Sequence, residues 1–146
     1  MQIICLDDAG CLYLSPRIED WKFVEDREIT TVIDLDGDLD TCIPTMPNHI
    51  LYLYFPIYDE DLPDMPKLHG VARLAASLIA DGHKVLSHCG MGFNRSALMA
   101  GLILMYLGME GSEAVALLRH KRPGALFNEV FADYLLNLRG LTPVQP

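Results

Sequence analysis

Two chemically reactive side chains, Cys89 and Arg95, lie six positions apart in a short segment that also holds Gly90 and Gly92. A thiol that faces backbone N–H donors and a guanidinium ionises more readily than a free thiol, and the thiolate is the nucleophile. Arginine presents a planar fork of donors that matches two oxygens of a phosphate group. The glycines allow the backbone to curl close to a ligand. The segment therefore combines a nucleophile, a cradle for an oxyanion and a clamp for negative charge.

The elements on either side of this segment predict how it is held. Residues 84–87 form a short apolar run typical of a buried strand, and residues 96–107 form a helix too apolar to lie at a surface. The loop between them joins a buried strand to the N-terminus of a buried helix. Successive backbone N–H groups and the helix dipole then point at one spot, which suits an anion.

The spelling His-Cys-x-x-Gly-x-x-Arg-Ser at residues 88–96 resembles the signature of the cysteine-dependent protein tyrosine phosphatase superfamily. Three weaker similarities resemble its dual-specificity branch, and the small size of the chain fits the small atypical type. They are Leu-Tyr-Leu-Ser at 12–15, Ile-Thr-Thr-Val-Ile-Asp-Leu at 29–35 and Arg-Pro-Gly-Ala-Leu-Phe-Asn at 122–128. The resemblance covers residues 11–138.

The order of strands and helices favours a central sheet flanked by helices. The resemblance implies an α/β, protein tyrosine phosphatase-like fold, whose central mixed sheet is mostly parallel, with residues 1–146 as one catalytic domain. The strands are expected at residues 2–6, 11–14, 30–35, 51–57 and 84–87. The helices are expected to begin at Ser15-Pro16, to cover 66–80, 96–107 and 113–120, and to follow a cap at Asn128, with a frayed tail from Gly140.

The resemblance assigns a role to each residue of the loop. Cys89 is expected to attack phosphorus and form a phosphocysteine, while Arg95 holds the equatorial oxygens. Ser96 caps the helix, and the resemblance implies that it also hydrogen-bonds to the thiolate and eases breakdown of the phosphoenzyme. His88, adjacent to Cys89 on a strand, points the other way and is expected to orient the loop through hydrogen bonds. The residues expected to bind phosphate with Arg95 are Gly90, Met91, Gly92, Phe93 and Asn94.

Catalysis also needs a carboxylic acid that protonates the leaving oxygen and later activates water. Asp59, Asp61 and Asp64 lie in a loop that follows the expected strand 51–57. Asp64 precedes Met-Pro and is expected to cap the next helix. The family places its acid about thirty residues before the nucleophile, and Asp59 lies 30 residues before Cys89. We therefore favour Asp59 as the general acid, with Asp61 as the alternative.

The charge of the chain restricts its partners. Its 11 basic and 20 acidic residues give a formal net charge of −9. A surface this acidic does not suit the backbone of a nucleic acid, so any phosphate site must be a local positive spot in a negative field. We expect the partner to be a phosphorylated protein or peptide, with no nucleic acid and no membrane.

The remaining composition points to a reduced, cytoplasmic enzyme. Four cysteines are too few and too irregularly spaced for a disulfide scaffold, and no spacing of Cys and His indicates zinc. The first residues carry acid where a signal peptide needs base, and no apolar run reaches membrane-spanning length. We expect neither a metal nor a cofactor.

Two clusters of charge allow more than one interpretation. The aspartates at positions 34, 36, 38 and 40 could form a metal site, but a solvated turn around Gly37 is favoured. Arg119 and Arg122 could reach a second phosphate or an acidic peptide, but a helix end that complements the helix dipole is favoured.

The function favoured by these residues is hydrolysis of phosphotyrosine in proteins, and of phosphoserine and phosphothreonine if the pocket is shallow. The alternative is a non-protein substrate, such as a small phosphorylated metabolite or the 5′-polyphosphate end of an RNA, because Gly-Phe-Asn-Arg resembles the RNA 5′-triphosphatase relatives. The charge of −9 and the acid at Asp59 disfavour RNA. A non-catalytic phosphate-binding module, a rhodanese-like sulfur carrier and an arsenate reductase are also less favoured.

Overall fold

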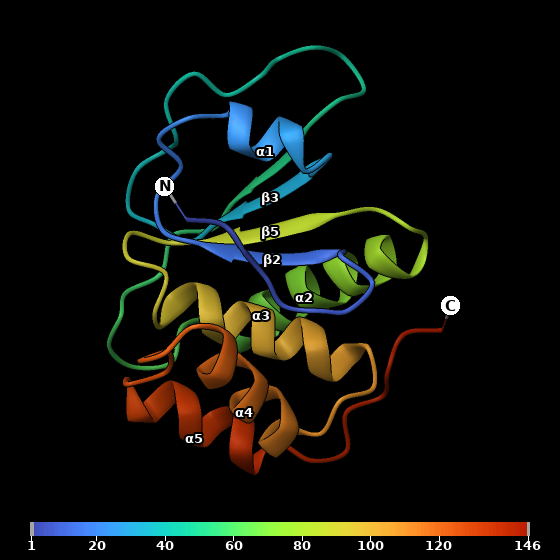
Figure 1. Cartoon of the computed structure of the whole chain (residues 1–146). Helices are drawn as coiled ribbons and strands as arrows, with labels where there is room; N and C mark the ends of the chain where they lie inside the picture. The colour runs from blue at the N-terminus through green and yellow to red at the C-terminus, as the bar shows by residue number, and fades with distance from the viewer. Residues whose placement is uncertain (1, 146) are drawn as a thin grey trace.

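The computed structural model describes residues 2–145, which form one five-stranded sheet with helices on both faces (Figure 1). The strand order is β1-β2-β5-β3-β4. The antiparallel strand β1 lies at one edge, and the other four strands run parallel. This is the mixed, mostly parallel sheet that the sequence predicts. The strands are β1 (Ile4–Cys5), β2 (Leu12–Ser15), β3 (Thr31–Asp34), β4 (Leu51–Tyr54) and β5 (Val85–His88).

The helices cover the two faces of the sheet unequally. The short helix α1 lies on one face, and the four longer helices lie on the other (Figure 1). Each face has its own cluster of buried apolar side chains, and the larger one fills the space between the sheet and the four helices. The helices are α1 (Lys22–Asp26), α2 (Met65–Ala80), α3 (Arg95–Tyr106), α4 (Gly111–Lys121) and α5 (Glu129–Asn137).

Helix α3 is the centre of the larger core, and every residue of it after Arg95 is buried. Gly101 permits this packing, because a Cβ there would lie 2.6 Å from a methyl group of Leu135 in α5. Among residues 2–145, no helix combines the length and the apolar character needed to cross a membrane.

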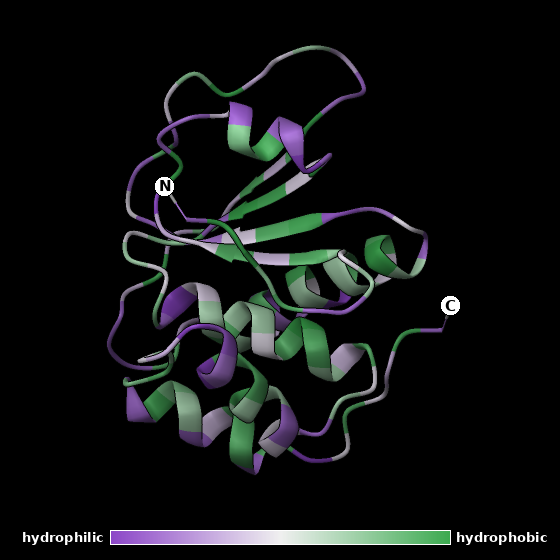
Figure 2. Ribbon diagram, viewed as in Figure 1, coloured by the Kyte–Doolittle hydropathy of each residue, from purple (hydrophilic) through white to green (hydrophobic). Residues whose placement is uncertain are grey.

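The strand β5 lies between β2 and β3 and is fully buried, as the apolar run predicts. Much of the strand is hydrophobic (Figure 2). Its last residue, His88, is in register with Ser15 of β2 and Asp34 of β3. The carboxyl ends of three parallel strands therefore meet directly before Cys89, at the edge where open α/β sheets bind their ligands.

Two expected helix caps are confirmed, one expected cap is wrong, and one expected helix start is wrong. Ser96 does not cap α3, because the helix already begins at Arg95 and no side chain caps it. Asp64 accepts a hydrogen bond from the N–H of Lys67, and Asn128 caps α5. No helix begins at Ser15-Pro16, because Ser15 is the buried last residue of β2 and α1 begins only at Lys22. Strand β4 ends at Tyr54, three residues before the expected boundary.

The solvated turn expected around Gly37 is wrong for two of its aspartates. Asp34 is 0% exposed and Asp36 is 8% exposed, whereas Asp38 is exposed. The difference arises because β3 is an interior strand, so the polar residues at its carboxyl end lie against β5 and the loop after it.

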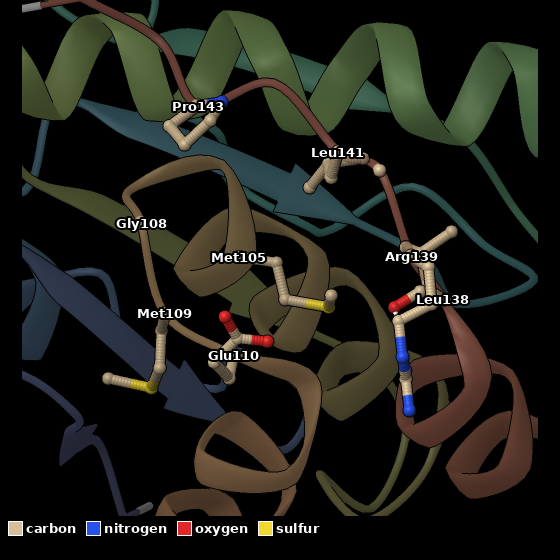
Figure 3. A pocket seen from close by; sticks show the side chains of 9 residues that line it. Met105, Gly108, Met109, Glu110, Leu138, Arg139, Leu141 and Pro143 are labelled. Carbon is tan, nitrogen blue, oxygen red and sulfur yellow. Dashed lines mark hydrogen bonds between the residues drawn. The ribbon is translucent and has the colours of Figure 1, made fainter.

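The chain after α5 is packed rather than frayed. The N–H of Val144 donates to the carbonyl of Tyr106, and the tail covers the far end of α3. A cavity of about 260 Å³ lies between the tail and the turn after α3, lined by Met105, Glu110 and Arg139 among others (Figure 3). It lies at the opposite end of α3 from Arg95 and takes no part in the loop at Cys89.

His69 of α2 links two other helices through a partly buried hydrogen-bond cluster. Its Nδ1 lies 2.6 Å from the hydroxyl of Tyr106, and its Nε2 lies 2.5 Å from that of Tyr134. Arg73 donates to the oxygen of Tyr106, so the hydroxyl proton of Tyr106 is available to Nδ1 of His69. Burial lowers the pKa of His69, and the guanidinium of Arg73 lowers it further.

We predict that His69→Gln destabilises the protein by about 1–2 kcal/mol at pH 7.5, through the loss of hydrogen bonds in the cluster. The folded state favours the neutral imidazole, so this contribution is fully present above the unfolded pKa of about 6.5 and declines as the pH falls below it. Urea unfolding from pH 7.5 to 5 should show the gap between wild type and variant becoming smaller. A gap that is constant or widens would contradict this linkage.

Candidate active site

The loop after β5 curls around the sulfur of Cys89. The backbone N–H of Gly92 donates to Sγ at 3.2 Å, and Oγ of Ser96 lies 3.2 Å from the same atom. Cys89 is only 2% exposed. The sulfur therefore lies within hydrogen-bond distance of a backbone N–H and a hydroxyl, close to the first turn of α3 and its dipole.

The curl depends on a glycine at position 92. Gly92 has φ +76°, a conformation that side chains rarely adopt, and a Cβ there would lie 2.9 Å from the nitrogen of Pro16. The segment directly after β2 also supports the loop, because the N–H of Arg17 donates to the carbonyl of Gly90 at 3.2 Å. Ser15 and Pro16, at which the sequence predicts a helix start, therefore pack against this loop instead.

Arg95 is the first residue of α3 and lies beside the loop. Its Nη1 is 3.4 Å from Oδ1 of Asp36 and 3.4 Å from the carbonyl oxygen of Ile57. Its Nε is buried and has no hydrogen-bond partner among residues 2–145. A buried donor without a partner is costly, so this group is suited to an incoming anion.

Asp36 links Arg95 to a second arginine that sequence analysis did not assign to the site. Arg17 donates to Oδ2 of Asp36 from Nη2 at 3.0 Å and from Nε at 3.3 Å. Burial alone would raise the pKa of Asp36, but the N–H of Gly37 and the two guanidiniums outweigh it and lower the pKa. The signal available in the sequence is the position of Asp36 just after the apolar run 30–35, which predicts a buried strand.

His88 points away from Cys89, into a buried polar cluster. Its Nε2 lies 2.7 Å from Oδ2 of Asp40 and 3.7 Å from Oδ1 of Asp34. Tyr52 donates its hydroxyl to Asp34 and accepts the N–H of Asp40 at 2.9 Å. Burial raises the pKa of Asp34, although Tyr52 and His88 act against that.

The same cluster is the metal alternative that the aspartates suggested. The ligand atoms of Asp34, Asp40 and His88 lie within 4.8 Å of one another. Each is already engaged, because Nε2 of His88 bonds to Asp40 and the carboxylates contact Tyr52. This arrangement fits a hydrogen-bond network that holds the His88 ring.

Two asparagines hold Asp59 beside the loop. Oδ2 of Asp59 accepts from Nδ2 of Asn94 at 2.9 Å, and Oδ1 accepts from Nδ2 of Asn128 at 2.8 Å. The backbone N–H of Asn128 in turn donates to Oδ1 of Asn94 at 2.9 Å. This tethering role of Asn128 is not expected from the sequence, although residues 122–128 carry part of the resemblance.

The two other acids of this loop lie elsewhere. Asp64 is engaged as the cap of α2. Asp61 lines a depression that does not include Arg95, whereas Asp59 and Arg95 line one cleft of about 600 Å³. The geometry therefore brings Asp59, rather than Asp61, together with the loop.

Two arginines at the end of α4 donate hydrogen bonds to backbone carbonyls of neighbouring segments. Arg119 donates to the carbonyls of Ala125 and Leu126. Arg122 donates to the carbonyl of Met91 at 3.0 Å, and its guanidinium lies 4.0 Å from the ring centre of Phe93. Arg122 therefore supports the loop through the backbone of Met91 and the ring of Phe93.

Comparisons with known proteins agree on the family. The model for the dual specificity phosphatase catalytic domain matches residues 12–139. Among curated proteins, no sequence is similar enough to count as a match. The crystal structure of Tk-PTP in its active form is 27% identical and has a TM-score of 0.72, covering 91% of this chain and 92% of that one.

Two further solved structures share the fold at lower identity. Human DUSP28 is 19% identical with a TM-score of 0.76, covering 91% of this chain and 89% of its own. A mouse putative dual specificity phosphatase, crystallised with zinc tungstate, is 20% identical with a TM-score of 0.76, covering 91% and 83%.

We predict that Gly92→Ala weakens binding of inorganic phosphate or tungstate at least tenfold, because the new Cβ meets backbone atoms of Pro16 and Ser15. Isothermal titration calorimetry measures the binding, and thermal unfolding monitors the fold. The matched control is Gly70→Ala in α2, where the nearest atom is the flexible Nη2 of Arg73 at 3.9 Å. Anion binding equal to wild type in Gly92→Ala would show that the curl of this loop is not the anion site.

Proposed function

Because the chain belongs to the dual specificity phosphatase family, we propose that it is a phosphatase that hydrolyses phosphomonoesters of proteins, phosphotyrosine above all, through a phosphocysteine on Cys89. The observation that carries the proposal is the pairing of the Cys89 sulfur with the N–H of Gly92 and the hydroxyl of Ser96, beside the unpartnered Nε of Arg95. A nucleophile and an anion site coincide there.

In the first step the thiolate of Cys89 attacks phosphorus in line with the leaving oxygen. The Sγ–P bond forms as the P–O bond of the ester breaks. Arg95 and the loop N–H groups of residues 90–96 hold the three equatorial oxygens, on which the charge of the transition state is spread. Asp59, held by Asn94 and Asn128, gives its proton to the leaving oxygen.

In the second step water attacks the phosphocysteine. The carboxylate of Asp59 takes a proton from the water as its oxygen bonds to phosphorus, and the Sγ–P bond breaks to release phosphate. The hydroxyl of Ser96, 3.2 Å from Sγ, donates to the sulfur as it regains its negative charge. His88 acts as a positioning residue, because Asp40 and Asp34 hold its ring away from the reacting atoms.

The net charge of −9 and the position of Asp59 support a protein substrate over an RNA end. A non-protein substrate, such as a small phosphorylated metabolite, is the alternative. We also propose that residues 1–146 form one catalytic domain in a reducing, cytoplasmic compartment, which is supported by four free cysteines, Cys5, Cys11, Cys42 and Cys89. Comparing turnover of a phosphotyrosine peptide, a phosphothreonine peptide and triphosphate-ended RNA tests the substrate class.

We predict that Cys89→Ser abolishes hydrolysis of p-nitrophenyl phosphate, lowering kcat by at least about a thousandfold, because a hydroxyl at this site is not ionised. The variant should still bind inorganic phosphate within about threefold of wild type, since Arg95 and the loop N–H groups are intact. Steady-state kinetics and calorimetry measure the two quantities. A variant that retains turnover would exclude Cys89 as the nucleophile.

We predict that Asp59→Asn lowers kcat/KM about a hundredfold for aryl phosphates with poor leaving groups and much less for p-nitrophenyl phosphate, whose leaving oxygen needs no proton in the first step. A plot of log kcat/KM against the leaving-group pKa should become steeper. Asp61→Asn is the control and should keep the wild-type slope. Asn128→Ser retains an oxygen to cap α5 but loses the amide donor to Asp59. Its slope should lie between those of Asp59→Asn and Asp61→Asn. A steeper slope in Asp61→Asn alone would show that Asp61, and not Asp59, is the general acid.

A further inference from the structure

The cleft that contains Arg95 has an acidic wall. It measures about 600 Å³ and is lined by one guanidinium, Arg95, and by three carboxylates, those of Asp36, Asp59 and Glu60. Pockets of this size hold a drug-sized ligand or a few side chains, so there is room for a residue next to the phosphorylated one.

The three carboxylates are not equally neutralised. Asp36 is paired with both Arg17 and Arg95. Asp59 contacts only the neutral amides of Asn94 and Asn128. The exposed carboxylate of Glu60 forms no ion pair within residues 2–145. Glu60 therefore leaves an uncompensated negative charge on the wall of the cleft.

An exposed aromatic side chain lines the same cleft. Tyr58, also in the cleft lining, is 82% exposed and adjacent in sequence to Asp59. An exposed aromatic face next to a carboxylate suits an ammonium or guanidinium, which can contact both. Met91 and Phe127 are also exposed, to 68% and 67%, and Phe93 packs against both Phe127 and Arg122.

The negative charge of this wall repels a phosphate dianion. An acidic residue next to the phosphotyrosine would increase that repulsion. A lysine or arginine in that position would instead contact Glu60 and Tyr58. Building on the proposed function, we propose that Glu60 is a specificity residue and that the substrates are phosphotyrosine peptides with a lysine or arginine beside the phosphorylated residue.

Three peptides of equal length, each with one phosphotyrosine flanked by lysine, alanine or glutamate, test this proposal. We expect kcat/KM to fall in that order, with about a tenfold difference between the lysine and glutamate peptides at low ionic strength. Because surface charges are screened, the difference should shrink severalfold at 0.5 M NaCl. Equal rates for the three peptides, or a preference for glutamate, would overturn the inference.

Variants of Glu60 attribute the preference to one side chain. Glu60→Gln should reduce the lysine-to-glutamate ratio about threefold, and Glu60→Lys should reverse it. The control is Glu113→Lys, which makes the same charge change on the first turn of α4, an exposed position far from the loop. Ratios that change equally in Glu60→Lys and Glu113→Lys would refute a local role for Glu60.

Hydrolysis of p-nitrophenyl phosphate separates this inference from the proposed function. A wild-type protein that hydrolyses neither this compound nor any of the peptides would overturn the phosphatase proposal itself. A protein that hydrolyses all of them without a charge preference would leave the phosphatase proposal standing and overturn only the role of Glu60.

Discussion

The loop from Cys89 to Arg95 can hold an anion only while its backbone stays curled around one sulfur atom. The N–H of Gly92 reaches that sulfur because its residue adopts φ +76° directly against Ser15 and Pro16. Three distant segments maintain this curl. The end of β2 lies behind it, the end of α4 holds the carbonyl of Met91, and Leu126 donates to the carbonyl of Phe93 at 2.8 Å. The shape of the proposed anion site therefore depends on the whole fold, since none of these supports is local in sequence.

The electrostatics of the site reflect a proposed anion site in an acidic protein. The guanidinium of Arg95 would be attracted to any nearby carboxylate, and Asp36 occupies that position. Arg17 draws the same carboxylate toward itself at a shorter distance, 3.0 Å against 3.4 Å. Arg95 therefore keeps a buried Nε without a partner, although the chain carries nine negative charges in excess. Because Asp36 is shared between two arginines, it orients Arg95 without occupying all of its N–H donors.

The parts of the site that are contiguous in sequence could be predicted, and the parts that depend on strand order could not. The strand, loop and helix around Cys89 carry their own signals in apolar runs and glycines, and the caps at Asp64 and Asn128 are local hydrogen bonds. The burial of Asp34 and Asp36 follows from the place of β3 inside the sheet, which no run of residues encodes. Ser15-Pro16 carries a true helix-start pattern, but pairing of Ser15 with His88 extends the strand instead. Tertiary pairing overrode local propensity at that point.

Asn128 shows why one side chain can matter to both folding and chemistry. Its Oδ1 caps α5, while its Nδ2 donates to Asp59 and to the carbonyl of Glu60. Its backbone N–H also fixes the buried amide of Asn94, which donates to the other oxygen of Asp59. The loop that carries Asp59 and Glu60 is thus attached to the N-terminus of α5 and to the loop at Cys89 by one closed set of hydrogen bonds. Because each group in the set has a partner, moving Asp59 away would leave the buried amide of Asn94 without its acceptor, and that cost favours the position next to Arg95.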